Sequence, residues 1–268
     1  MGSLRWLNLF LLVLFPLLAD IVEDASDLRD NGRVDEAITK LKSAGSSGDI
    51  GAEQLLAKLY LDTEQYPEAI KIYTKICPIL KSYECYNELG ISYITSGIYS
   101  DAVTAFQKSL ELQPNFATGY SNLAQAHLML GEIDKSESNH KKALELSPNN
   151  PIIRINYGVF LVKMKRYQRA KDVLYPVVAE NDSLFYAELY IGIAHYFREE
   201  YHSALIHFNR GLAINPEYYD LYYYRALLYY KKGEYSDSLE DLKMVDKLFP
   251  TNEKSIKLKK IIMKNSKI

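Results

Sequence analysis

The feature that most constrains this chain is a recurrence of proline and glycine at intervals of 34 residues. Four prolines are separated by 34, 68 and 34 residues, and two sets of glycines keep the same interval. Because both residue types interrupt helices, a shared interval of this length indicates an array of helical repeats. The prolines are Pro114, Pro148, Pro216 and Pro250; the glycines are Gly90, Gly158 and Gly192 in one set and Gly97, Gly131 and Gly233 in the other.

Each interval predicts two amphipathic helices. Apolar residues recur at three- and four-residue spacing and are interrupted once by glycine and once by proline. The glycine falls where the first helix ends and a left-handed backbone is needed, as at Gly97 and Gly233. Proline cannot continue the second helix and so closes the unit. Small residues such as Ala102, Ala170 and Ala204 indicate close helix crossings, and we expect neighbouring units to share one continuous core.

The interval divides most of the chain into units of equal length. The unit at 50–82 is one residue short, and residues 20–49 fit the pattern loosely. Residues 253–268 are predicted to be a C-terminal capping helix, with Ile256, Ile261 and Ile262 facing the last unit. The predicted array covers residues 20–49, 50–82, 83–116, 117–150, 151–184, 185–218 and 219–252.

The residues at these recurring places resemble the tetratricopeptide repeat. Two departures are mild: Ser136 and Ser238 replace a small alanine, and the unit 151–184 lacks the closing proline. The resemblance implies an all-α fold, namely an α-solenoid with a right-handed superhelix of about six to seven helix-turn-helix repeats and a concave groove. In the unit 83–116 the matching residues are Tyr86, Leu89, Gly90, Tyr93, Gly97, Tyr99, Ala102, Phe106, Leu110 and Pro114.

The first nineteen residues predict a signal peptide or an N-terminal membrane anchor. Residues 7–18 are apolar except for Asn8, with Arg5 before them and Ala19 where a signal peptidase would cut. As a helix, residues 4–19 would span about 24 Å, which is shorter than a bilayer core of about 30 Å. A first helix of the array is the alternative. We expect an exported, periplasmic or membrane-anchored protein of the cell envelope rather than a cytoplasmic one, with membrane contact only through this segment.

The two cysteines are too few for a disulfide scaffold or a cysteine-rich metal site. Cys77 lies at the end of the second helix of one predicted unit, and Cys85 lies in the first turn of the next. Packing is therefore expected to bring them close together. Export would permit a disulfide between them, and the alternative is that both are small core residues.

The sequence shows no recognisable pattern of catalytic residues. The sequence has no phosphate-cradling glycine loop, nucleophile elbow or zinc-binding helix motif. His127, His140 and His195 occupy aromatic places of the repeat, so we interpret them as buried, hydrogen-bonded core residues. His202 and His207 are five residues apart and do not share a helix face. We predict a protein that is not an enzyme and has no cofactor and no metal.

The charge balance excludes a strongly basic nucleic-acid binder. The chain has 32 Lys and Arg against 34 Asp and Glu, a net charge of -2. The acidic pairs Glu199–Glu200 and Glu240–Asp241 are interpreted as turn or solvent-facing charges. The six lysines of 253–268 are interpreted as the solvated face of the cap, with contact to an anionic surface as the alternative.

In the tetratricopeptide repeat the second, fifth, ninth, twelfth and thirteenth places line the concave groove. These places are mixed in the units from 83 to 150 and become apolar in 151–184 and 185–218. A helix that is apolar on all sides is buried or covered by a partner. Tyrosine is concentrated in the same part, with twelve of 23 in residues 185–252. The predicted partner-binding residues are Ile152, Ile155, Val159, Tyr186, Leu189, Ile193, Tyr196, Phe197, Tyr223, Leu227 and Tyr230.

These groove places do not suit a clamp for the acidic C-terminal tail of a chaperone. Such clamps place Lys and Asn at the fifth and ninth positions, where this chain has pairs such as Ile155 with Val159 and Leu189 with Ile193. We predict a non-catalytic scaffold that binds an apolar or aromatic helix or segment of a partner protein in the groove. Two other occupants remain open: the chain's own residues 7–18, and a second copy in a homo-oligomer. An accessory subunit of an enzyme is a remote alternative.

Overall fold

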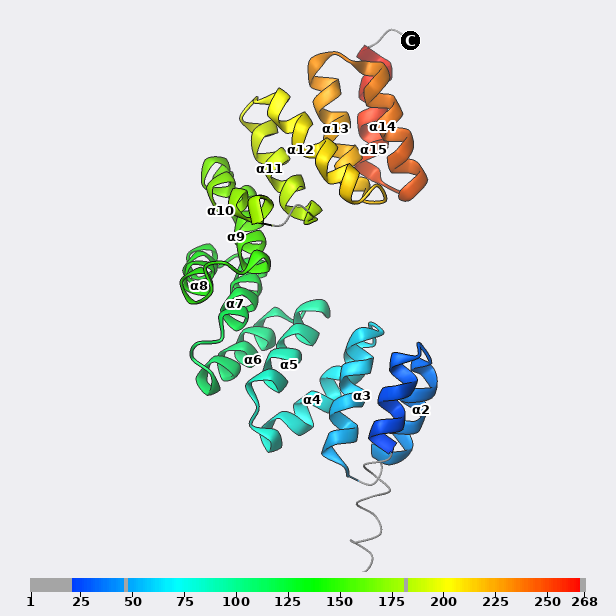
Figure 1. Ribbon diagram of the computed structural model, residues 1–268, viewed down its shortest axis with the longest axis vertical. Coiled ribbons are helices and arrows are strands. Elements are labelled where there is room, and N and C mark those ends of the chain that lie inside the picture. Colours follow the sequence, from blue (N-terminus) through cyan, green and yellow to red (C-terminus); the bar gives the residue numbers. More distant parts are fainter. Residues whose placement is uncertain (1–20, 46–47, 181–182, 266–268) are drawn as a thin grey trace, which may run out of the picture. The chain divides into compact units, whose positions relative to one another are not determined.

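The computed structural model describes residues 21–45, 48–180 and 183–265, and no strand occurs within these ranges. The chain divides into two compact units, residues 1–143 and residues 144–268, which are described separately. Within each unit, consecutive helices lie alongside one another as antiparallel pairs (Figure 1).

The first unit consists of helix pairs that follow the chain order. Residues 21–30 are helical and precede α2. The next helices alternate as first and second members of their pairs, and α8 ends just past the division between the units. The bounds are α2 (Val34–Gly45), α3 (Ile50–Asp62), α4 (Tyr66–Leu80), α5 (Tyr83–Thr95), α6 (Tyr99–Leu112), α7 (Ala117–Met129) and α8 (Ile133–Leu146).

The second unit continues with three pairs and a final helix. Its first helices contact one another in succession, α9 with α11 and α11 with α13, and α15 packs on α13 and α14. The bounds are α9 (Pro151–Lys163), α10 (Tyr167–Glu180), α11 (Phe185–Phe197), α12 (Tyr201–Ile214), α13 (Tyr219–Lys232), α14 (Tyr235–Leu248) and α15 (Glu253–Asn265).

The prediction of an all-α array of helix-turn-helix repeats is confirmed. From residue 50 onward, every interval of the sequence pattern contains one helix pair, and α15 follows the last pair. The predicted signal or anchor at 1–19 lies outside the described residues. Within the described ranges, every helix is too short or too polar to cross a membrane.

The turn inside each pair adopts the left-handed backbone that the glycine pattern predicts. Gly97, Gly131 and Gly233 have φ between 76° and 81°. Glu64, Lys165 and Glu199 occupy the same place in the pairs that lack the glycine, and their φ angles are 60°, 57° and 62°. The repeat geometry therefore imposes this conformation even where the residue has a Cβ that disfavours it.

The recurrent glycine of the first helix allows close contact with the second helix. A Cβ atom on Gly90 would lie 2.5 Å from the Phe106 ring, and one on Gly192 would lie 2.5 Å from the Phe208 ring. Both phenylalanines are fully buried. In each case the two residues are 16 apart, so glycine and the large apolar residue are one packing feature repeated along the array.

The two serines that replace the small alanine keep the same close crossing. The Ser136 hydroxyl donates to the carbonyl of Ala124 at 2.8 Å, and the Ser238 hydroxyl donates to the carbonyl of Ala226 at 2.7 Å. Both serines are fully buried. Since the hydroxyl finds an acceptor on the facing helix, serine is tolerated at a place that otherwise requires alanine.

The capping helix α15 packs through a different face from the one expected. Leu258 and Ile262 are buried against the α13–α14 pair, where the core includes Val245. Ile256 and Ile261 are exposed, so the prediction was right for Ile262 and wrong for these two. The spacing of the buried residues, four apart, defines the stripe that faces the last pair.

The two cysteines are joined in the structure. Cys77, in the last turn of α4, and Cys85, in the first turn of α5, form a disulfide with a Cα–Cα distance of 5.5 Å. Both residues are buried in the core of the first unit. The expected proximity is therefore observed, and the disulfide connects one helix pair to the next. Its formation in the native compartment stays a prediction.

Candidate functional site

The candidate binding surface is the face formed by α9, α11 and α13, called here the α9–α11–α13 face. It contains all eleven residues predicted to contact a partner. Three of them are exposed in the free chain: Ile152 at 64%, Tyr186 at 44% and Phe197 at 51%. Five are half-buried: Ile155, Val159, Tyr223, Leu227 and Tyr230.

Three of the predicted partner-binding residues are buried within the second unit itself. Leu189 is 2% exposed, Ile193 is 3% exposed and Tyr196 is 8% exposed. The prediction that they are available to a partner was therefore wrong. Successive first helices contact one another closely enough to cover these side chains, an effect that the sequence of one repeat does not reveal.

Aromatic contacts hold the exposed part of this face in place. The Phe197 ring stacks on the Tyr167 ring of α10, with centroids 5.2 Å apart and planes 9° apart. The Tyr186 ring lies 4.2 Å from the Phe185 ring and 5.3 Å from the Tyr218 ring. These contacts restrict the side chains before any partner arrives, which reduces the entropy that binding must remove.

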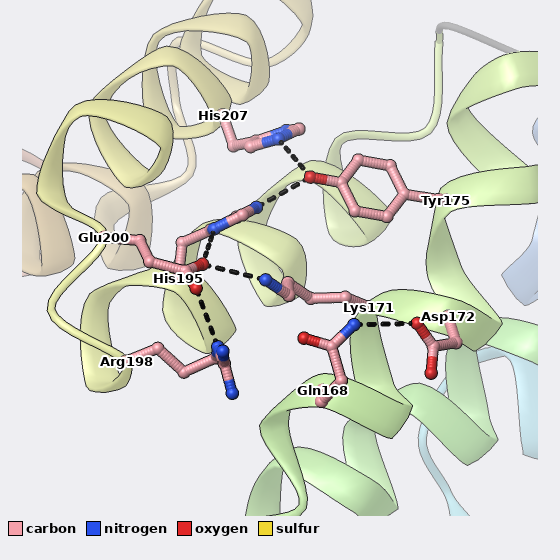
Figure 2. A network of polar contacts seen from close by, with 8 residues as sticks. All are labelled: Gln168, Lys171, Asp172, Tyr175, His195, Arg198, Glu200 and His207. Carbon is pink, nitrogen blue, oxygen red and sulfur yellow. Dashed lines mark hydrogen bonds and ion pairs between the residues drawn. The ribbon is translucent and has the colours of Figure 1, made fainter.

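A polar network connects α10 to the α11–α12 pair (Figure 2). The Tyr175 hydroxyl is 2.7 Å from His195 Nε2 and 3.4 Å from His207 Nε2, and the two imidazole rings stack with centroids 5.3 Å apart. His207 Nδ1 is 2.5 Å from the Glu188 carboxylate. His195 Nδ1 contacts the Glu200 carboxylate.

Glu200 forms ion pairs with two cationic side chains of this network. Its carboxylate accepts from Lys171 Nζ and from Arg198 Nε, each at 2.8 Å. The hydrogen bond from Lys171 is the main cause that lowers the pKa of Glu200 to about 2. Lys171 is itself buried, so its ammonium group depends on this carboxylate for compensation.

The network fixes the tautomer of His195. Burial lowers the pKa of His195, so the ring is neutral at pH 7. Nδ1 then carries the hydrogen that faces Glu200, and Nε2 accepts from the Tyr175 hydroxyl. Burial also raises the pKa of Tyr175, as does the charge of Glu200, which disfavours the tyrosinate. A carboxylate, an imidazole and a hydroxyl lie in series here, but the hydroxyl is not activated as a nucleophile.

Sequence reasoning predicted only part of this network. His195 was correctly interpreted as a buried, hydrogen-bonded residue. Glu200 lies at the turn before α12 as predicted, but it is a member of an ion-pair cluster rather than a solvent-facing charge. Lys171 and Tyr175 were missed because they occupy places at which the repeat specifies no residue type. Glu188 was missed because it stands at the place of Tyr86, where the repeat pattern leads one to expect an aromatic residue.

Asp241 also differs from the prediction of a solvent-facing charge. It is buried and accepts two hydrogen bonds from Arg225, at 2.8 Å from Nε and 2.7 Å from Nη2. Burial raises the pKa of Asp241, while Arg225 opposes that shift. The guanidinium group lies over the Tyr222 ring at 5.6 Å and also donates to Asn209. Because Arg225 and Asp241 lie on α13 and α14, they connect the two helices of the last pair.

The other histidines predicted to lie in the core are buried as well. His127 contacts Glu132 at 2.5 Å, and His140 is fully buried in α8. Burial lowers the pKa of His140 to about 4. Within the described ranges, no group of three or more His, Cys, Asp or Glu residues is arranged to hold a metal ion.

Comparison with known proteins identifies the repeat. Residues 90–131 match the family described as TPR repeat, and residues 117–150 and 190–253 match families described as tetratricopeptide repeat. This chain is a tetratricopeptide-repeat protein. Its fold is also similar to the crystal structure of a tetratricopeptide repeat protein from Parabacteroides merdae, with a TM-score of 0.75, 15% identity and coverage of 92% of this chain and 98% of that one.

Two curated relatives illustrate the roles found among similar proteins. The type IV pilus assembly protein PilF of Pseudomonas aeruginosa is 28% identical over 160 residues, which is 57% of this chain and 61% of PilF. The heat shock protein STI1 of Saccharomyces cerevisiae is 34% identical over 89 residues, which is 32% of this chain and 15% of STI1. The chain thus spans less than two thirds of either relative.

Proposed function

We propose that this protein is a non-catalytic scaffold that binds an apolar or aromatic segment of a partner protein on the α9–α11–α13 face. The observation that carries the proposal is the exposure of Ile152, Tyr186 and Phe197 on one face of a helical array. Large apolar side chains grouped on a surface are a common mark of a protein-binding site. A helix or extended segment of a partner would cover them.

We further propose that the protein acts in the assembly of a larger complex at the cell envelope. The apolar segment at 7–18 supports export or tethering. Similarity to a type IV pilus assembly protein supports an envelope location and an assembly role. We infer no enzyme activity, since the two carboxylate–imidazole–hydroxyl series found among the described residues, through His195 and through His207, both end at Tyr175, whose pKa is raised.

The test is partner recovery from cells of the source organism with single substitutions on two different faces. Ile152→Ser removes an exposed apolar side chain from the α9–α11–α13 face, and Ile206→Ser removes one from α12. Neither side chain is in the core, so both variants are expected to fold. We expect Ile152→Ser to reduce recovery of the partner and Ile206→Ser to leave it unchanged.

Equal recovery with both variants would contradict this assignment of the binding face. Two further preparations test the other occupants. If deletion of residues 1–19 were needed before the face accepted any partner, the chain's own apolar segment would be the native occupant. If the solution mass of the wild type were that of a dimer and Ile152→Ser were a monomer, a second copy would be the occupant.

A further inference from the structure

Asp220 lies among aromatic side chains at the start of α13. It is half-buried in the first turn of the helix, two residues after Tyr218 and one turn before Tyr223 and Tyr224. The Tyr218 ring in turn lies 5.3 Å from the Tyr186 ring, edge to face, and 4.9 Å from the Phe185 ring. Aromatic residues of α11 therefore pack on Tyr218, two residues before Asp220, at the exposed edge of the α9–α11–α13 face.

Further tyrosines are within electrostatic reach of the same carboxylate. Burial is the larger cause and the charge of Asp220 the second cause of a raised pKa at Tyr190, Tyr223 and Tyr224. The pKa of Tyr224 is raised to about 12. The Tyr223 and Tyr224 rings lie 5.5 Å apart, edge to face. Asp220 thus holds a negative charge in a partly dry, tyrosine-lined environment.

A lysine of the same chain, Lys254, lies beside these tyrosines. It comes from α15, and its Nζ lies over the Tyr223 ring, 5.9 Å from the centroid. Its charge lowers the pKa of Asp220, against the larger effect of burial, which raises it. In the part of the chain that the structure describes, no cation forms a direct ion pair with Asp220. Lys254 is exposed, so it can be displaced without unfolding α15.

We propose that Asp220 and its tyrosines form a site for a lysine or arginine side chain of the partner segment, and that Lys254 is an internal ligand which the partner's cation displaces. The Asp220 site is defined by Asp220 with Tyr186, Tyr218, Tyr223 and Tyr224.

Charge complementarity supports a cationic occupant. The faces of tyrosine rings attract cations, and a carboxylate with few hydrogen bonds gains most from a charged donor. A helix N-terminus alone would explain an acidic residue in the first turn of α13. It does not explain why Lys254 of a separate helix lies over a tyrosine beside that carboxylate. The inference rests on the proposed function: the partner segment would carry one basic residue beside its apolar residues.

The direct test is an NMR titration of the full-length protein with labelled tyrosines. The probes are Nα-acetyl-lysine methylamide and its neutral analogue Nα-acetyl-norleucine methylamide. We expect the lysine compound to shift the ring signals of Tyr186, Tyr218 and Tyr223 in a saturable way, and the norleucine compound not to do so. Equal shifts with both probes would overturn the inference.

Three variants make the test specific. Asp220→Asn keeps the size of the side chain and is expected to weaken binding of the lysine compound about tenfold. Asp237→Asn changes another first-turn aspartate, on α14, and is expected to leave binding unchanged. Lys254→Met removes the internal ligand and keeps the carboxylate, so it is expected to tighten binding severalfold.

Wild-type affinity in Asp220→Asn, or weaker binding in Lys254→Met, would overturn the inference. Its failure is distinguishable from failure of the proposed function. If the tyrosine signals ignored the lysine compound while Ile152→Ser still lost the partner, only the cation site would be wrong. If the lysine compound bound as expected while Ile152→Ser kept the partner, only the binding face would be wrong.

Discussion

The Tyr175 hydroxyl on α10 donates to His195 Nε2 on α11 at 2.7 Å, and so joins one repeat to the next. His195 is buried, and its other ring nitrogen, Nδ1, contacts Glu200. Among the contacts drawn in Figure 2, the donor to Nε2 is therefore the Tyr175 hydroxyl. The contact is one of the polar links between repeats, alongside the ion pair of Lys171 with Glu200.

Loss of this hydroxyl is expected to weaken the second unit. Tyr175→Phe leaves a buried acceptor without its donor and should lower the free energy of unfolding by about 1–2 kcal/mol in urea titrations followed by circular dichroism. Tyr167→Phe is the matched control, because that ring stacks on Phe197 and stacking survives loss of the hydroxyl. A change of similar size in both variants would contradict the assigned role of the hydroxyl.

Substitutions in the left-handed turns are expected to change the free energy of unfolding in opposite directions, depending on whether glycine is introduced or removed. Lys165→Gly and Glu199→Gly should each raise the free energy of unfolding by about 0.5–1 kcal/mol, since both residues have positive φ. Gly97→Ala should lower it by about 1 kcal/mol, because the Cβ would be strained by φ although it meets no close atom. Thermal and urea unfolding measure all three. Destabilisation by Lys165→Gly would show that its side chain contributes more than the backbone strain costs.

His140 should make the first unit sensitive to acid. Burial holds its pKa at about 4, whereas the unfolded chain has a value near 6.5, so between these values only the unfolded state binds the proton. Stability is therefore fully present above the unfolded value and falls as the pH drops. The loss from this group between pH 7.5 and pH 5 should be about 2 kcal/mol.

His140→Leu removes this contribution and should reduce the dependence of stability on pH by that amount. Leucine suits the place better than phenylalanine does, because Ala124 stands where other repeats have glycine, and Ala226 faces Leu242 at the equivalent places. His202→Gln, which changes an exposed histidine on α12, is the control and should leave the pH dependence as it is. An unchanged slope in His140→Leu would exclude His140 as its source.

The disulfide between Cys77 and Cys85 closes a short loop between two helix pairs. Reduction is expected to lower the stability of the first unit by about 2–3 kcal/mol, chiefly by releasing the unfolded chain. Mass spectrometry of protein purified without reductant shows whether the disulfide is present. Unfolding with and without reductant measures the change in stability. The double variant Cys77→Ala/Cys85→Ala should be insensitive to reductant. Two free thiols in protein isolated from its native compartment would contradict the prediction.

The fold could be predicted from the sequence because the repeat specifies residues at the turns and at the helix crossings. Gly192 and Phe208 show this: they are 16 residues apart, they recur along the chain, and they pack directly on each other. The proximity of Cys77 and Cys85 followed from the same register.

The proposed binding face could be predicted only in part. Which helices form it follows from the repeat, but which side chains are exposed depends on how closely neighbouring repeats approach. Leu189 and Tyr196 are covered by adjacent helices, whereas Phe197 is not. The network around Tyr175 and Glu200 involves places where the repeat leaves the residue type free, so no pattern within one repeat could indicate it.

The most direct measurement of the central claim is site-specific photocrosslinking in cells of the source organism. A photoreactive phenylalanine analogue is placed at Phe197, on the α9–α11–α13 face, and separately at Ile206, on α12; both positions are exposed. We predict one discrete crosslinked partner protein from position 197 and none from position 206. The same products from both positions, or a crosslink from position 197 only to another copy of this chain, would contradict the account.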